Sequence, residues 1–124
     1  MNMNDYQDET PKTAAPYHEA VTVIMSGDNV IVEDFLAVAY CAGKLNGEAG
    51  EVAEEVFKAL RDDGGKFTEE RLRTLRKELG DVLWYVSQLH NELGLRMERT
   101  MELNLIKLQS RKERDQLRGS GSDR

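Results

Sequence analysis

Two pairs of acidic side chains are the residues of this chain best suited to chemistry. Glu48-Ala-Gly-Glu51 places two carboxylates three residues apart, and Glu78-Leu-Gly-Asp81 repeats that spacing. Residues three apart lie on one face of a helix, where like charges repel, so local helix energetics do not explain the pairs. Carboxylates that converge need a cation to offset their repulsion. We expect Mg²⁺, which prefers oxygen ligands and usually keeps water and substrate phosphate in its shell, with Mn²⁺ as a substitute.

Each acidic pair also contains a glycine, Gly50 in the first and Gly80 in the second. Glycine inside a helix costs on the order of 1 kcal/mol relative to alanine. We expect the missing side chains to let two helices approach closely, so that the carboxylates meet. The alternative is that these acids are simply solvated, as most of the 23 acidic residues must be. Apolar neighbours such as Val52 and Val82 favour the metal site, because solvated faces do not normally carry acids along an apolar stripe.

Composition narrows the class of protein further. The length of 124 residues suggests one domain. The net charge of −6 argues against stable nucleic-acid binding, since phosphate neutralisation needs surplus Lys and Arg. No run is long and apolar enough to span a bilayer, and the polar, acidic start has no features of a signal peptide. The single cysteine, Cys41, excludes an intrachain disulfide, lies in an apolar run that indicates core packing rather than catalysis, and fits a cytoplasmic location.

Helical periodicity dominates the rest of the chain. We expect a short helix over Tyr17–Met25, a long one over Val32–Leu60 that ends at the Gly64-Gly65 turn, and a third that is capped by Thr68 and reaches Glu92. A last helix is expected over Met97–Gln116, with a packed face formed by Met101, Leu105 and Leu108.

No segment reads as a strand long enough to build a sheet. The expected fold is therefore all-α, a four-helix-type bundle in a single domain over residues 1–117, followed by a flexible Gly/Ser tail at 118–124. Because small helical domains often pair to hide more apolar surface, we expect an oligomer.

The acidic pairs and their flanks resemble a known family. Asn46-Gly-Glu-Ala-Gly-Glu-Val-Ala-Glu-Glu55, followed by Glu78-Leu-Gly-Asp-Val-Leu-Trp-Tyr85, is similar to the ExxE–spacer–ExxD signature of MazG-like nucleotide pyrophosphohydrolases, in the all-α NTP pyrophosphatase superfamily. Asn104-Leu-Ile-Lys107 resembles that family's NxxK element. The likeness covers roughly residues 44–111, and the acidic pairs carry most of it.

The resemblance implies a particular reaction and particular roles. It implies a Mg²⁺-dependent hydrolase that cleaves an NTP or dNTP to the monophosphate and pyrophosphate through a metal-activated water, in a nucleotide-pool or housecleaning role. It implies that Glu48, Glu51, Glu78 and Asp81 bind the metal and that Asn104 and Lys107 contact the nucleotide. It also implies a homodimer or tetramer in which a neighbouring subunit often completes each site. Two alternatives stay open: a phosphoribosyl-ATP pyrophosphohydrolase on the same scaffold, and a non-catalytic nucleotide-binding helical dimer.

Further candidates follow from the residues themselves. Glu51 could act as general base if the metal does not engage it fully. Lys58, seven residues beyond Glu51, either reaches the outer phosphates or is a solvated surface lysine. Trp84 either stacks on the base or packs in the core. We expect Glu54 and Glu55 to be solvated, although either could reach the site.

Overall fold

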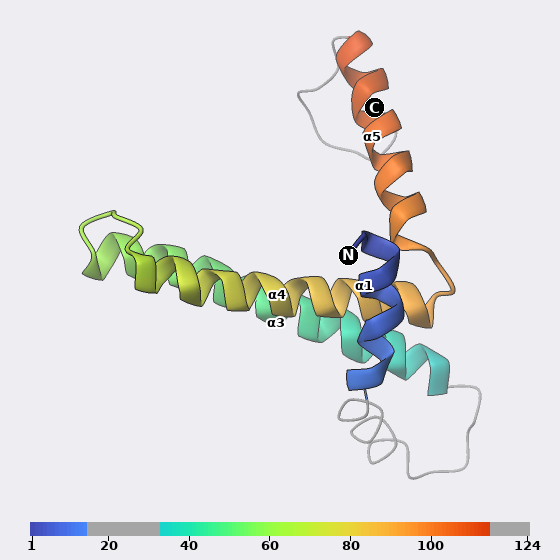
Figure 1. Ribbon diagram of the computed structural model, residues 1–124, viewed down its shortest axis with the longest axis horizontal. Helices are drawn as coiled ribbons and strands as arrows, with labels where there is room; N and C mark the ends of the chain where they lie inside the picture. The colour runs from blue at the N-terminus through green and yellow to red at the C-terminus, as the bar shows by residue number, and fades with distance from the viewer. Residues whose placement is uncertain (15–32, 115–124) are drawn as a thin grey trace.

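The described part of the chain, residues 1–14 and 33–114 of a computed structural model, consists of helices and their connections (Figure 1). A short helix, α1 (Met3–Glu9), continues into the 3₁₀ turn η1 (Thr10–Thr13). Three longer helices follow: α3 (Glu33–Asp62), α4 (Glu69–Glu92) and α5 (Met97–Glu113). Within these ranges there is no strand, so the prediction of an all-α fold is confirmed. The helix expected over 17–25 and the tail at 118–124 lie outside the described residues.

Helices α3 and α4 form a long antiparallel hairpin that lies across Figure 1. The turn between them uses Gly64 and Gly65, whose φ angles of 63° and 76° favour glycine. The amide of Gly65 donates to the carbonyl of Ala59 at 3.0 Å and closes the end of α3. Thr68 then accepts a hydrogen bond from the amide of Arg71 at 3.1 Å, as the sequence predicted for the first residue of the next helix. Local sequence thus sets both ends of the turn.

Helix α1 crosses α4 near the open end of the hairpin (Figure 1). Its buried Gln7 donates to Asn91 at 3.0 Å and to the carbonyl of Leu95 at 2.7 Å, and it accepts from the amide of Met97 at 2.9 Å. A capping box closes the start of this seven-residue helix. No periodic pattern of apolar residues marked the segment, so the sequence did not predict α1. Through these hydrogen bonds, α1 holds the end of α4 and the start of α5 together.

The hydrophobic core of the described residues is small and lies where the end of η1 meets α3 and α4. Cys41 is fully buried beside Ala14, which confirms its role as a core residue. Partly buried hydrophobic residues pack around these two: Leu36, Tyr40, Trp84, Tyr85 and Leu89. Within the described ranges, no helix combines the length and the apolar composition that a membrane span needs.

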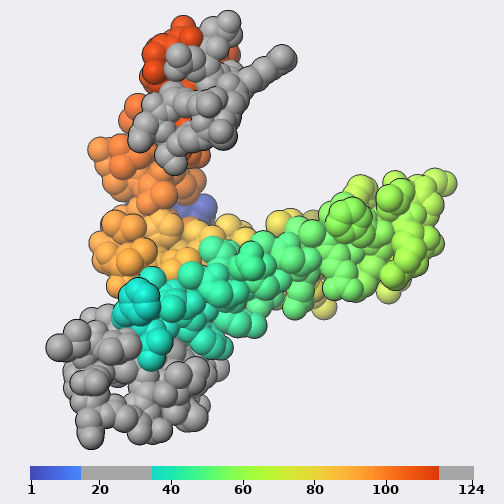
Figure 2. Space-filling model, turned by 180° about the vertical axis from the view of Figure 1, so that it is seen from behind, coloured from blue at the N-terminus to red at the C-terminus, as the bar shows by residue number. Residues whose placement is uncertain are grey.

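Helix α5 projects away from the hairpin, as Figures 1 and 2 show from opposite sides. Gly94, with a φ of 65°, ends α4 and turns the chain outward. The face expected to be packed is open in the single chain, where Met101, Leu105 and Leu108 are 44%, 65% and 39% exposed. One chain therefore leaves the expected packed face uncovered, and the packing of this face stays a prediction. The described helices of one chain form a hairpin with two appended helices, and the four-helix-type bundle, the oligomer and the domain bounds stay predictions.

Candidate metal centre

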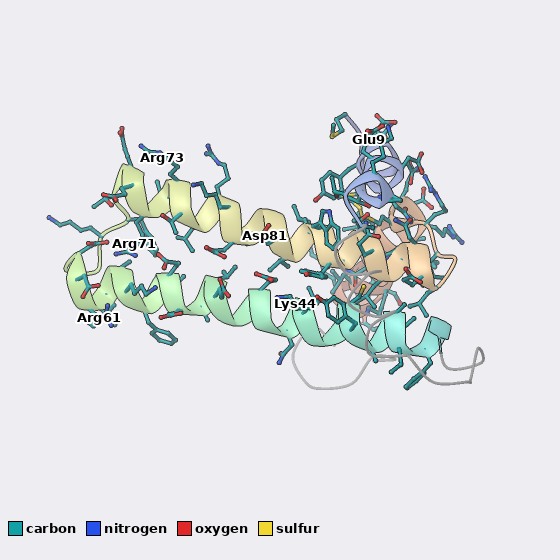
Figure 3. All side chains as sticks on the ribbon, turned by 90° about the horizontal axis from the view of Figure 1, so that it is seen from below. Glu9, Lys44, Arg61, Arg71, Arg73 and Asp81 are labelled. Carbon is teal, nitrogen blue, oxygen red and sulfur yellow. The ribbon has the colours of Figure 1, made fainter. Side chains whose placement is uncertain are left out.

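Three of the four predicted metal ligands come together between α3 and α4. Glu48 of α3 and Glu78 and Asp81 of α4 each offer a carboxylate oxygen, and these oxygens lie within 4.8 Å of one another. Figure 3 shows Asp81 on the side of α4 that faces α3. Glu48 and Glu78 are half-buried, whereas Asp81 is exposed. The cluster therefore opens to solvent on the Asp81 side.

The fourth predicted ligand, Glu51, lies at the edge of this cluster. It is exposed, and it lies close enough to Glu78 to affect that carboxyl. Burial and the neighbouring carboxylate of Glu51 raise the pKa of the Glu78 carboxyl, and Asp81 and Glu48 add to the effect. The repulsion within the cluster therefore acts most clearly on Glu78.

The donor set and its spacing fit a hard divalent cation. Oxygen ligands of Mg²⁺ stand 2.0–2.1 Å from the ion, so neighbouring ligands in an octahedron are about 2.9 Å apart and opposite ones about 4.1 Å. Oxygens within 4.8 Å of one another can reach these separations by side-chain movements of about one or two ångströms. A cation would also relieve the repulsion that raises the pKa of Glu78.

The glycines of the acidic pairs do not have the role expected of them. A Cβ atom added at Gly50 or at Gly80 would meet nothing within 4 Å. Close helix approach is therefore not the reason for either glycine, and the earlier interpretation is wrong. The helices converge through side chains such as Leu75 and Ala59, which are buried along the hairpin. The glycines instead leave open space beside the acids.

Lys44 is a residue of the site that sequence reasoning missed. Its ammonium lies 3.2 Å from Oε1 of Glu48 and 5.7 Å from the centre of the Tyr85 ring. The hydrogen bond to Glu48 is the largest cause of a raised pKa of Lys44. In Figure 3, Lys44 and Asp81 lie on the facing helices α3 and α4. The available signal was its position four residues before Glu48, which places both side chains on one helix face.

Lys58 is engaged in a separate group of charges near the hairpin turn. Its ammonium lies 2.8 Å from Glu55 and 3.3 Å from Glu54. Arg71 bridges the other oxygen of Glu55, at 2.6 Å, to Asp63, at 2.9 Å. Glu55 is buried, so the expectation that it is solvated is wrong. These ion pairs join α3 to α4. Lys58 is thereby paired with Glu54 and Glu55 rather than with the predicted metal ligands.

Trp84 lies on the side of α4 that packs against the hydrophobic core. Its indole N–H donates to the hydroxyl of Thr13 at 2.7 Å, and its ring meets Tyr85 edge-on with centres 4.8 Å apart. It packs beside Cys41 and Ala14. This placement favours the core-packing interpretation over the base-stacking one, and a contact between Trp84 and a nucleotide stays a prediction.

Asn104 and Lys107 lie away from the carboxylates of their own chain. Together with Leu95, Thr100 and Leu103, they line an open pocket of about 450 Å³ along α5. Because α5 projects from the hairpin, one chain does not bring this pocket to the cluster (Figure 1). The predicted nucleotide contacts therefore come from a surface separate from the predicted metal ligands.

Comparison with known proteins identifies the family. The fold and site describe an all-helical protein with an acidic cluster between two helices, and a family model, the MazG nucleotide pyrophosphohydrolase domain, matches residues 39–114. The Gene 37 protein of Mycobacterium phage L5 is 48% identical over 87 residues, which cover 70% of this chain and 76% of that protein. No solved structure matches the chain significantly.

The chain belongs to the MazG nucleotide pyrophosphohydrolase family, because the family model covers more than half of it. The resemblance indicated by the acidic pairs is thereby confirmed. The match contains all four predicted metal ligands as well as Asn104 and Lys107.

Proposed function

We propose that this protein is a Mg²⁺-dependent hydrolase that cleaves a nucleoside or deoxynucleoside triphosphate to the monophosphate and pyrophosphate. The carboxylate cluster of Glu48, Glu78 and Asp81 carries the proposal, since its oxygens lie within 4.8 Å of one another inside a MazG domain. A nucleotide-pool or housecleaning role in the cytoplasm agrees with this chemistry and with the buried thiol of Cys41.

The three clustered carboxylates would hold the cation from both helices. Bound there, Mg²⁺ would neutralise phosphate charge and make a water more acidic. Mn²⁺ accepts the same oxygen ligands and should substitute.

Glu51 is the best-placed residue to accept a proton from the attacking water. It lies beside Glu78 but outside the group of three oxygens, and it is open to solvent. A carboxylate that the metal does not fully engage could take the proton of the water. Lys44 adds a positive charge next to Glu48, where substrate phosphates would approach the cluster.

The exposed faces of α5 support a homodimer or tetramer. Apolar side chains such as Leu105 and Ile106 are 65% and 60% exposed in one chain, which favours burial against another copy. Asn104 and Lys107 lie on the same helix. We propose that a partner subunit brings these two residues to the carboxylate cluster, where the amide and the ammonium would bind the nucleotide.

The test is the release of pyrophosphate from a panel of canonical and modified nucleotides in MgCl₂. We expect Asp81→Asn to abolish release while Asp62→Asn, an acid exposed at the end of α3, leaves it at the level of the unaltered protein. Full activity in Asp81→Asn would overturn the metal assignment. Release from phosphoribosyl-ATP alone would select that substrate, and binding without turnover at any divalent ion would make the protein a nucleotide-binding module.

A further inference from the structure

Lys44 places a positive charge at the edge of the carboxylate cluster. Its ammonium lies 3.2 Å from Oε1 of Glu48, one of the three clustered residues. The same ammonium lies 5.7 Å from the centre of the Tyr85 ring on α4, close enough for the negative face of the ring to attract it. Tyr85 follows Asp81 by four residues, so both side chains lie on one face of α4. Lys44 therefore reaches from α3 toward α4 beside the cluster (Figure 3).

The energetics of an isolated helix do not account for this ion pair. A lysine four residues before a glutamate is the less favourable order, because the helix dipole prefers the acid nearer the N-terminus. Exposed pairs at this spacing also add little to stability. The Glu48 side chain, however, is only 12% exposed, and the carboxylates of Glu78 and Asp81 lie beside it. Without a metal ion, the ammonium of Lys44 offsets part of this concentrated negative charge.

The ammonium and a bound Mg²⁺ would share one carboxylate. Oxygen ligands of Mg²⁺ must come within 2.0–2.1 Å of the ion, so an oxygen of Glu48 that binds the metal would have a second cation within a few ångströms. Like charges at that distance repel. Metal binding therefore weakens the contact between Lys44 and Glu48.

A displaced Lys44 ammonium is well suited to bind phosphate. It carries three N–H donors on a flexible stem and acts as a compact positive charge. Its side chain is 45% exposed, so an anion can approach it from solvent, while the Tyr85 ring keeps it near the cluster. Mg²⁺ usually keeps substrate phosphate among its ligands, so a phosphate bound to the metal would arrive next to this ammonium.

We propose that Lys44 is an internal counter-ion of the carboxylate cluster, which leaves Glu48 when Mg²⁺ binds and then donates to a phosphate oxygen of the substrate. This inference rests on the proposed function and deepens it, because it gives Lys44 a different partner in each state. Lys44 then weakens the binding of metal alone and strengthens the binding of phosphate once metal is present. A lysine that only stabilises α3 would have neither effect.

The test is Lys44→Met, which keeps a long side chain and removes its charge. Affinity for Mg²⁺ is measured from the rise of Tm with MgCl₂ concentration, and affinity for inorganic pyrophosphate is measured by calorimetry in saturating MgCl₂. We expect Lys44→Met to bind Mg²⁺ about threefold to tenfold more tightly and pyrophosphate about tenfold more weakly. Lys44→Arg keeps the charge and should bind both as the unaltered protein does. Lys12→Met is the matched control with unchanged affinities, because Lys12 forms its exposed ion pair with Glu9, outside the cluster, at 2.6 Å.

The opposite signs of the two changes decide the role of Lys44. Weaker or unchanged binding of Mg²⁺ in Lys44→Met would overturn the counter-ion, and unchanged binding of pyrophosphate would overturn the phosphate contact. If Lys44→Met does not fold, Lys44→Gln removes the same charge and should show the same opposed changes.

The outcomes also separate this inference from the proposed function. Opposed changes in Lys44→Met, together with no release of pyrophosphate from any nucleotide by the unaltered protein, would disprove the hydrolase and support the role of Lys44. Pyrophosphate release by the unaltered protein, together with equal affinities in Lys44→Met, would overturn this inference alone. Absence of any response of the unaltered protein to MgCl₂ would overturn both.

Discussion

Replacing Glu78 with glutamine should stabilise the metal-free protein while removing its response to Mg²⁺. Glu78 has carboxylate oxygens of Glu48 and Asp81 within 4.8 Å, and its pKa is raised by burial and by the charges around it. Glutamine keeps the size of the side chain and removes its charge. The substitution therefore relieves repulsion in the absence of metal and deletes a ligand in its presence.

The size of the effect follows from the spacing of the cluster. Two unit charges 4.8 Å apart repel by about 1 kcal/mol at the dielectric constant of water and by about 3.5 kcal/mol at an effective value of 20. Because the cluster opens to solvent, we take the lower value for the repulsion from each of the two neighbours, Glu48 and Asp81. Glu78→Gln should therefore raise the free energy of unfolding of the metal-free protein by about 1–2 kcal/mol. For a domain of this size that corresponds to a rise of roughly 4–8 °C in Tm. Mg²⁺ at 100 times its Kd should add about 2.7 kcal/mol to the unaltered protein and little to Glu78→Gln.

The assay is thermal unfolding with EDTA and with MgCl₂, followed by circular dichroism. Glu69→Gln is the matched control, because Glu69 is an exposed acid in the first turn of α4, where the helix dipole favours negative charge. That control should lose a little stability and keep its full response to Mg²⁺. The reasoning is refuted if Glu78→Gln lowers Tm in EDTA, or if it gains as much from Mg²⁺ as the unaltered protein does.

The same cluster predicts a dependence of stability on pH. Because the pKa of Glu78 is higher in the folded protein than in the unfolded chain, its contribution to stability is present below the unfolded value and is lost as pH rises through the folded value. In EDTA, the difference in Tm between Glu78→Gln and the unaltered protein should therefore grow as pH rises through this window. Equal differences at low and neutral pH would contradict the assignment of the repulsion to Glu78.

Three further predictions concern residues outside the cluster. Gln7→Leu should lower the free energy of unfolding in urea by about 2–4 kcal/mol, because it leaves buried polar groups at the start of α5 without a partner; a loss below 0.5 kcal/mol would contradict this. Hydrogen bonds from Lys58 and Arg71 lower the pKa of Glu55, so the contribution of Glu55 to stability is lost as pH falls. Arg71→Met should therefore lower Tm at pH 7. The same variant should show a smaller fall in Tm between about pH 5 and pH 3 than the unaltered protein does. Mixing inactive Asp81→Asn with inactive Lys107→Met should restore activity if subunits share sites, whereas no recovery after subunit exchange would place both residues in one chain's site.

Local sequence predicted the hairpin well because its signals act over a few residues. The cap at Thr68 and the glycines at 64 and 65 belong to the turn itself, and each forms the contact expected of it. The acidic pairs were recognisable because their spacing conflicts with helix energetics, and the structure brings Glu48, Glu78 and Asp81 together.

Features that depend on distant contacts were not predictable in the same way. Helix α1 is short and owes its position to Gln7, whose hydrogen-bond partners are 84 to 90 residues away in the chain. Glu55 is paired with Arg71, 16 residues further on, and no local pattern marks that contact. The direction of α5 depends on Gly94 and Gln7 together. The spacing of apolar residues in α5 therefore indicated a buried face but did not indicate which surface covers it. Gly50 and Gly80 lower the stability of their helices, so a structural role was expected for both glycines. The sequence did not indicate what that role is.

The most direct test of the proposed function is ³¹P NMR of the products formed from a nucleoside triphosphate in MgCl₂. Cleavage between the α- and β-phosphates predicts equal amounts of nucleoside monophosphate and pyrophosphate, with both signals absent in EDTA. Formation of a nucleoside diphosphate and inorganic phosphate, or no turnover with any nucleotide of the panel, would contradict the proposed role of the carboxylate cluster.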